Sequence, residues 1–300
     1  MTRIVQRSIL ALTLSTVSVA PLWAQAPPAE PATATAPATA TAPAGAAAAI
    51  TQAPDDPDLD PNKAQPDFYV ATIPTNLRMP EHKMAFRLTH RFGRPLGQGD
   101  FQDLLADLFG FDSGAIIGME FRYGIIRGGQ VGIYRTSDRT IQFFGQYDIK
   151  NQKTFPVGIS AVANIDGTNN FSDSYSPGIS AVISREISDR ATLYAQPAWV
   201  NNSNPEPSEL VDDNNTAVIG LGARLRVHGS TYIVVEGSPR VSGYAPGKAL
   251  VSFGIEKQAG GHLFQLNFSN GFGTTLAQVA RGGTSYDDWY IGFNLSRKFF

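Results

Sequence analysis

The chain contains no cysteine among its 300 residues, which excludes disulfides, thiolate metal sites and a cysteine nucleophile. Charged residues make up only 17% of the sequence and the net charge is −2, so the chain has no electrostatic footprint for nucleic acid. Beyond the first 24 residues no apolar run approaches the roughly 20 residues that a membrane-spanning helix needs. If the chain crosses a membrane, it must cross it with strands.

The first residues are typical of a secretory leader. Two arginines precede an apolar stretch over residues 9–20, and small residues follow it. We expect a signal peptide over 1–24, cleaved after Ala24, because cleavage after Ala26 would leave Pro27 beside the cut. The alternative is a retained membrane anchor, for which the apolar stretch is short.

From about residue 83 to the end, apolar and polar residues alternate in short segments. Period two indicates strands, because successive strand side chains point to opposite faces. Most segments are near the 9 to 11 residues of a tilted membrane strand. We predict twelve strands, at 83–92, 115–124, 130–136, 139–149, 155–164, 177–187, 191–200, 216–227, 231–237, 249–257, 262–269 and 288–299.

The connections between these segments alternate between long and short, apart from a tight turn at Ser137-Asp138. Bacterial barrels place short turns in the periplasm and long loops outside, and an even strand count puts both termini in the periplasm. We therefore predict an antiparallel up-and-down transmembrane β-barrel of about twelve strands over 82–300. Its expected place is the outer membrane of a Gram-negative-type bacterium. The apolar or polar face is poorly defined in the segments at 191–200 and 231–237.

The segment before the barrel divides into two parts. Residues 25–66 are rich in Ala, Pro and Thr and poor in bulky apolar side chains, which favours a disordered periplasmic linker. Residues 67–81 have some strand-like content but contain two prolines, so we expect them to lead into the barrel or to fold beneath it. Residues 27–54 are interpreted as a spacer, with a peptidoglycan- or partner-binding role as the alternative, and the segment through which a periplasmic partner would dock is 27–81.

One phase of each predicted strand is apolar and should meet lipid, as Ile117, Met119 and Phe121 do on one strand. The opposite phase must point into the lumen, because an arginine at mid-bilayer on the lipid face costs about 2–4 kcal/mol. The predicted lumen-lining residues are Arg87, Arg91, Glu120, Arg122, Gln142, Gln146, Asp148, Arg224, Arg226 and Glu256, with Gln265 and Asn267 in the same phase. These charges either line a pore that selects ions or pair across a narrow barrel and plug it.

The first long loop interrupts the strand pattern. Between Phe101 and Phe111 apolar residues recur at helical spacing, which predicts a short amphipathic helix. Such a helix would constrict the barrel mouth, cap its rim or lie on the membrane surface. The acidic loop over 201–215 is expected to be solvated, with cation collection outside the barrel as the alternative.

The sequence gives no sign of a catalytic, cofactor or metal site. None of the four histidines sits beside a serine in a nucleophile motif, so a lipid hydrolase is only a remote alternative. The acidic run from Asp55 to Asp60 lacks the glycine and terminal glutamate of a calcium loop. Paired glycines such as Gly128-Gly129 mark turns and do not cradle phosphate.

Several short motifs occur in order between Thr75 and Lys153. They are Met79-Pro80, Leu88-Thr89-His90-Arg91-Phe92-Gly93, Leu108-Phe109-Gly110-Phe111-Asp112-Ser113-Gly114-Ala115, Tyr123-Gly124-Ile125, Gly132-Ile133-Tyr134-Arg135-Thr136-Ser137 and Gln146-Tyr147-Asp148. On these motifs the chain resembles a family of bacterial membrane-bound β-barrel proteins, known as domain of unknown function 5777. The resemblance implies a barrel and no established activity, so it assigns no functional residues.

The C-terminus is similar to that of outer-membrane barrels because it ends on an aromatic residue, Phe300. Recognition by the barrel assembly machinery is therefore expected, although the apolar phase leads to Phe299 instead. The function favoured by the mixed lumen charges is passive transport of small polar solutes or ions. The rival is a non-conducting structural or accessory barrel that docks a periplasmic partner. The only other partner expected is outer-membrane lipid.

Overall fold

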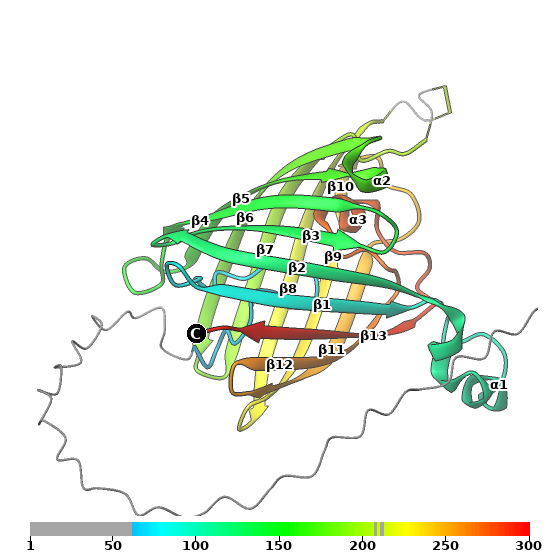
Figure 1. Ribbon diagram of the computed structural model, residues 1–300, viewed down its shortest axis with the longest axis horizontal. Helices are drawn as coiled ribbons and strands as arrows, with labels where there is room; N and C mark the ends of the chain where they lie inside the picture. The colour runs from blue at the N-terminus through cyan, green and yellow to red at the C-terminus, as the bar shows by residue number, and fades with distance from the viewer. Residues whose placement is uncertain (1–61, 207–208, 211–212) are drawn as a thin grey trace, which may run out of the picture. The chain divides into compact units, whose positions relative to one another are not determined.

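The computed structural model describes residues 62–206, 209–210 and 213–300. The predicted signal peptide and most of the predicted linker lie outside these residues and stay predictions. The described residues form a closed antiparallel β-barrel whose strands follow one another around the ring (Figure 1). The ring is closed because the last strand of the chain pairs with the first.

All twelve predicted strands are present, with ends that differ by a few residues. The strands are β1 Met84–Phe92, β2 Ala115–Ile126, β3 Gly129–Thr136, β4 Ile141–Lys150, β5 Gly158–Gly167, β6 Tyr175–Ser188, β7 Ala191–Asn201, β8 Asn215–His228, β9 Thr231–Ser238, β10 Arg240–Gly243, β11 Leu250–Ala259, β12 His262–Ser269 and β13 Tyr290–Lys298. The additional strand β10 continues β9 beyond Pro239 and pairs with the same neighbour, β8. Proline has no N–H to donate, so it interrupts this edge of the ladder.

Short turns gather at one end of the barrel and long loops at the other (Figure 1). The C-terminus lies at the end with the short turns, which we call the turn end. The opposite end, the loop end, carries α1 Phe101–Ala106, η1 Leu108–Ser113, α2 Thr168–Phe171 and α3 Leu276–Arg281. The predicted exception is present as well, since β3 and β4 are joined at the loop end by a tight turn over 137–140.

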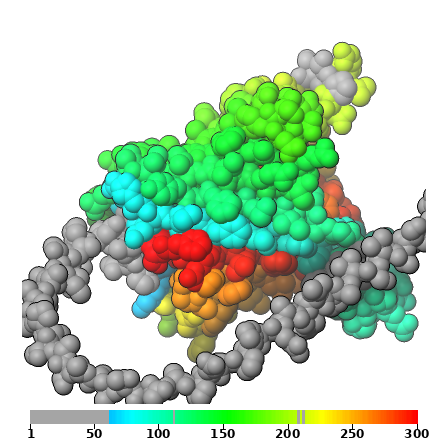
Figure 2. Space-filling view, in the orientation of Figure 1, coloured from blue at the N-terminus to red at the C-terminus, as the bar shows by residue number. Residues whose placement is uncertain are grey.

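The barrel is apolar outside and polar inside, the reverse of a soluble protein. On β2, Met119 and Phe121 are 44% and 48% exposed, whereas Glu120 and Arg122 between them are each 2% exposed. β1 and β13, from opposite ends of the chain, lie side by side on the outer surface of the barrel (Figure 2). This inversion is the pattern of a barrel whose outer face contacts lipid. No helix in the described ranges is long and apolar enough to cross a membrane.

The predicted helix of the first long loop is present but lies outside the lumen. It comprises α1 and η1, separated at Asp107, and Leu108, Phe109 and Gly110 have positive φ angles. Asp100 caps the start of α1, and none of the residues of α1 is buried. The interpretation of this helix as a constriction of the barrel mouth is therefore wrong, because its side chains face solvent and not the interior.

Candidate functional site

The interior of the barrel is occupied by the chain's own residues 62–81, which enter from the turn end. Residues 68–75 form a tight hairpin with a bridge between Tyr69 and Pro74. The amide of Val70 donates to the carbonyl of Ile73 at 2.8 Å, which closes the turn. Val70 and Ile73 are each 1% exposed and Ala71 is fully buried. We call residues 68–75 the lumen hairpin.

A single carboxylate on the barrel wall holds the tip of the lumen hairpin. Glu236, on β9, accepts hydrogen bonds from the backbone amides of Ala71, Thr72 and Ile73 at 2.9–3.1 Å. The hydroxyl of Thr72 donates to the same carboxylate at 2.5 Å. Successive amides that point at one anion form a concave site with a partial positive charge, so the hairpin tip neutralises a carboxylate that is only 3% exposed.

Wall side chains donate hydrogen bonds to the carbonyls of the lumen hairpin. The carbonyls of Tyr69, Val70, Ala71 and Thr75 all have such partners. The donors are Arg87 and Asn294 to Ala71, Arg224 to Tyr69, Gln265 to Val70, and Gln146 to Thr75. Because these donors come from β1, β4, β8, β12 and β13, the hairpin is tied to the wall around most of the ring. The backbone polar groups of a loop inside a barrel need such partners, since they have lost water.

The residues predicted to line the lumen are brought together by this arrangement. Eight are buried inside the barrel, namely Arg87, Arg91, Glu120, Arg122, Gln142, Gln146, Arg224 and Glu256. Asp148 and Arg226 lie near the turn end, where they pair with Arg78 and Asp189. Gln265 and Asn267 are also buried and hydrogen-bond each other at 2.9 Å.

Two ion pairs form between these lumen residues. Arg224 and Glu256 approach to 2.8 Å with both side chains fully buried, and Arg122 and Glu120 approach to 3.0 Å. Among the described residues, Arg87 and Arg91 have no carboxylate within ion-pair distance. Arg91 donates instead to the side-chain oxygen of Asn294 at 2.9 Å.

Aromatic and aliphatic contacts supplement the hydrogen bonds. The guanidinium of Arg87 lies 4.0 Å from the ring centroid of Tyr69, and that of Arg122 lies 4.8 Å from the ring of Phe68. On the other side of the hairpin, Val70 and Ile73 pack against Tyr194 of β7 and Val234 of β9. The two strands whose faces the sequence defined poorly are thus among those that turn apolar side chains inward.

A second segment fills the lumen from the loop end. Helix α3 begins at Thr275, whose side chain accepts from the amide of Gln278 in a capping box. Ala277 and Ala280 are buried against Val200 and Val218 of the wall. Asp166 of β5 accepts from the amide of Ala277 at 3.2 Å, so the helix start is also tied to the wall.

Between the lumen hairpin and α3 little open space remains. The cavity there has a volume of ≈30 Å³ and is bounded by Tyr69 and Thr72 on one side and Leu276 and Val279 on the other. A space of this size holds a few waters at most, so the lumen hairpin and α3 lie close together here. The residues predicted to lead into the barrel or to lie beneath it thus lie inside it. Packing continues into the predicted linker, where Ala64 and Gln65 are each 5% exposed.

The described residues contain no arrangement of catalytic or metal-binding groups. No cluster of three or more metal-ligating side chains occurs among them. His82 lies within hydrogen-bond distance of Tyr123, and His262 of Arg297. The groups gathered in the lumen can bind and orient polar solutes or hold a peptide segment.

Comparison with solved structures finds bacterial porins. The NanC porin is 10% identical over 72% of this chain and 100% of its own, with a TM-score of 0.49. A mutant of the Rhodopseudomonas blastica porin carrying three substitutions is 15% identical over 61% of this chain, with a TM-score of 0.33. This chain spans 55% of the length of that porin.

Comparison with curated proteins finds no match. A family match, in contrast, extends over residues 68–299 and so includes the lumen hairpin together with every strand of the ring. The family is described as a membrane bound beta barrel domain, in agreement with the apolar outer face and the closed ring. The chain belongs to the membrane bound beta barrel domain family, DUF5777.

Proposed function

We propose that this protein is an outer-membrane channel for small polar solutes or ions that is closed at rest by its own lumen hairpin. The observation that carries the proposal is the way the hairpin is held. It is bound to a wall of charged and amide side chains by hydrogen bonds that water could replace, notably those to Glu236. A twelve-stranded barrel without this hairpin is wide enough for a narrow channel.

The wall behind the hairpin supports this proposal. Arg87, Gln146 and Gln265 donate hydrogen bonds to the hairpin, and together with Arg91 they are buried in a lumen that the hairpin and α3 fill. Once those segments move, the same side chains would line a hydrated conduit and would bias which ions enter it. The outer membrane is the place proposed because bacterial barrels of this kind occur there and because the sequence predicts a secretory leader.

The second candidate is a non-conducting barrel that docks a periplasmic partner through residues 27–81. The filled lumen favours this candidate directly, since the described conformation leaves only ≈30 Å³ between the two inner segments.

Planar-bilayer recording of the full-length protein separates the two candidates. The channel proposal expects an almost silent wild type and stepwise openings when Glu236→Gln loosens the hairpin. Adding Arg91→Gln to the opened variant should then shift ion selectivity toward cations, because Arg91 faces the lumen without touching the hairpin. Arg135→Gln is the control, since Arg135 is exposed on β3. Silence of an inserted Glu236→Gln barrel would favour the docking candidate.

A further inference from the structure

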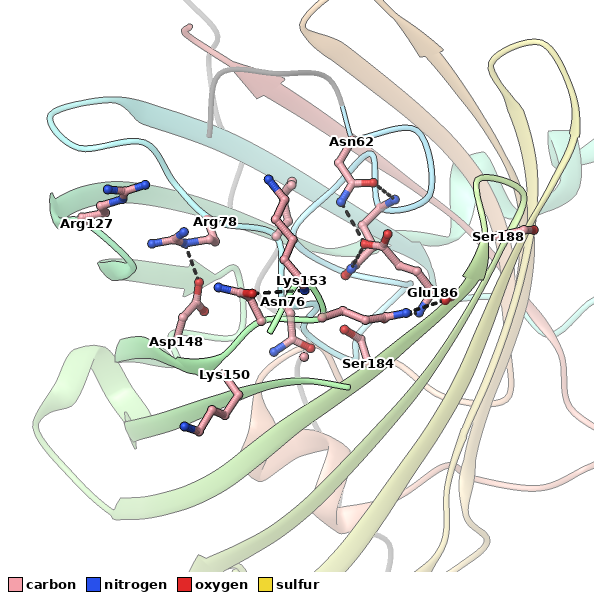
Figure 3. A pocket seen from close by; sticks show the side chains of 15 residues that line it. Asn62, Asn76, Arg78, Arg127, Asp148, Lys150, Lys153, Ser184, Glu186 and Ser188 are labelled. Atoms are coloured by element: carbon pink, nitrogen blue, oxygen red, sulfur yellow. Dashed lines mark hydrogen bonds and ion pairs between the residues drawn. The ribbon is translucent and has the colours of Figure 1, made fainter. Parts of the chain in front are cut away.

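A second, larger cavity opens at the turn end of the barrel, where residues 62–81 enter (Figure 3). Its volume is ≈570 Å³, within the range of small-molecule sites in proteins. One wall comes from the entering segment, with Gln65 and Asn76, and the other from turns of the barrel, with Arg127, Lys150 and Lys153. The cavity is therefore complete only while the segment is in place.

The cations around this cavity outnumber the carboxylates. Both lining carboxylates are engaged, because Asp148 pairs with Arg78 at 2.8 Å and Glu186 accepts from the side chains of Asn62 and Gln65 at 3.0 and 2.6 Å. In contrast, the structure gives no ion pair within its described ranges for the three basic residues from the barrel turns, Arg127, Lys150 and Lys153. A net positive charge remains in the cavity.

The surrounding surface strengthens this charge. The turn end carries further basic side chains at strand ends and turns, among them Lys83, Arg185, Arg190 and Lys257. The loops at the opposite end carry many acidic ones, among them Asp100, Asp103, Asp138 and Asp173. A recess lined by charges of one sign focuses the field and concentrates ions of the opposite sign. Anions should therefore collect at the turn end.

The inner wall of the cavity adds a different requirement. The side-chain oxygens Oε1 of Gln65 and Oδ1 of Asn76 are buried and have no hydrogen-bond partner in the described part of the protein. Gln65 is only 5% exposed and its amide nitrogen is already committed to Glu186. Both oxygens are shielded from the open cavity, and a buried acceptor without a donor is unfavourable, so turning either amide toward a ligand that brings hydroxyl donors would be favourable.

We propose that this cavity is a binding site for a small organic anion that carries hydroxyl groups, such as a phosphorylated or carboxylated polyol. Lys150, Lys153 and Arg127 would receive the phosphate or carboxylate, and the amide oxygens of Gln65 and Asn76 would accept from the hydroxyls. The site lies outside the lumen hairpin and does not depend on whether the barrel conducts.

Isothermal titration of the full-length protein in detergent with glycerol 3-phosphate tests this site. One saturable site per chain is expected, with at least tenfold weaker binding of sulfate, which lacks hydroxyls, and of glycerol, which lacks charge. The double variant Lys150→Gln/Lys153→Gln should weaken binding of glycerol 3-phosphate at least tenfold. Lys83→Gln/Arg190→Gln removes the same charge at the same end but outside the cavity, and should change affinity less than twofold.

Two further experiments test the role of the Gln65 amide and the source of the ligand. Gln65→Met should weaken glycerol 3-phosphate more than sulfate, because it removes only an amide. Repeating the titration in nanodiscs of phosphatidylglycerol and of phosphatidylcholine identifies the source of the ligand. Weaker binding in phosphatidylglycerol alone shows that a lipid headgroup competes for the site, and equal binding indicates a free solute.

The chain's own acidic run could compete as well, since Asp60 lies two residues before Asn62. The titration is therefore repeated with Asp55, Asp56, Asp58 and Asp60 changed to asparagine, and competition would appear as tighter binding. The absence of saturable binding to both forms would overturn the proposal. An equal loss in the cavity variant and in its charge-matched control would overturn it too, because binding would then follow net charge alone.

Discussion

The contact between Glu236 and the tip of the lumen hairpin is the part of the structure on which closure depends most. Replacing Glu236 with glutamine keeps the size of the side chain and one acceptor oxygen, but turns an NH₂ group toward the backbone donors. Glutamine can keep its oxygen in the place of Oε2, which accepts from Ala71 and Ile73, so the amide of Thr72 is the donor that loses its Oε1 partner and faces the NH₂ group instead. At about 1–3 kcal/mol for an unsatisfied buried donor, the seated hairpin should be weakened by about 1–3 kcal/mol.

This loss raises the population with a displaced hairpin by roughly 5-fold to 150-fold, since about 1.4 kcal/mol corresponds to a factor of ten. The lower part of the range is expected, because glutamine also avoids the cost of burying a charge. The barrel itself should remain folded, because β9 keeps its backbone pairing with β8 and β11.

Two assays measure this change. Amide hydrogen exchange at Ala71, Thr72 and Ile73 should accelerate by the same factor, and the open fraction in a planar bilayer should rise with it. Ser252→Ala is the matched control, because Ser252 is buried in the lumen but bonds only to Ser269. Exchange within twofold of the wild type would refute the argument that Glu236 holds the hairpin, whatever the conductance.

Three other expectations follow from the same contacts. Arg224→Met should destabilise the barrel by about 3–5 kcal/mol because Glu256 is left charged and unpaired. Adding Glu256→Gln should recover most of the lost thermal stability. Heat-modified gel mobility measures the stability of both variants. A hydrogen bond from Arg94 lowers the pKa of Asp107 below its ordinary value of 3.8. Asp107 should therefore stabilise η1 fully above pH 3.8, and this stabilisation should be lost as the pH falls through the lowered pKa. Hydrogen exchange of the Gly110 amide, which donates to Asp107, measures the loss. Normal exchange at acidic pH would contradict this expectation. Ala280→Glu should separate α3 from the barrel wall but leave the conductance low, because the lumen hairpin still fills the barrel. Large channel openings from this single change would mean that α3 is the main barrier.

The strands could be predicted from the sequence because their signal is local. A lipid-facing side chain and its lumen-facing neighbour differ sharply in polarity, as Phe121 and Arg122 do, and this contrast repeats every second residue. The same contrast identified the wall residues that contact the hairpin, including Arg87 and Arg224. It could not show what those residues bind, because the partners lie far away in sequence. Ala71 and Glu236, for example, are separated by 165 residues.

Two signals for the inner segments were nevertheless visible. Strands β7 and β9 alternate poorly because Tyr194 and Val234 point inward, and an apolar patch on a barrel's inner wall requires something apolar beside it. The sequence Thr275 to Gln278 has the spacing of a capping box, which predicts a helix start in a loop. Neither signal indicates whether the segment folds into the barrel or away from it. The sequence alone therefore does not predict that the lumen is filled.

The charges around the hairpin argue for a closure that can be reversed. Glu236 has no cation within ion-pair distance among the described residues, and Arg87 has no carboxylate there. The hairpin supplies amides to Glu236 and a carbonyl to Arg87 in place of water. Withdrawing the hairpin would break these hydrogen bonds but would return both charges to water. The free energy of opening is therefore the difference between the lost hydrogen bonds and the regained hydration. A wall lined with paired charges or apolar residues would lack this compensation, and the same hairpin would then be a permanent core.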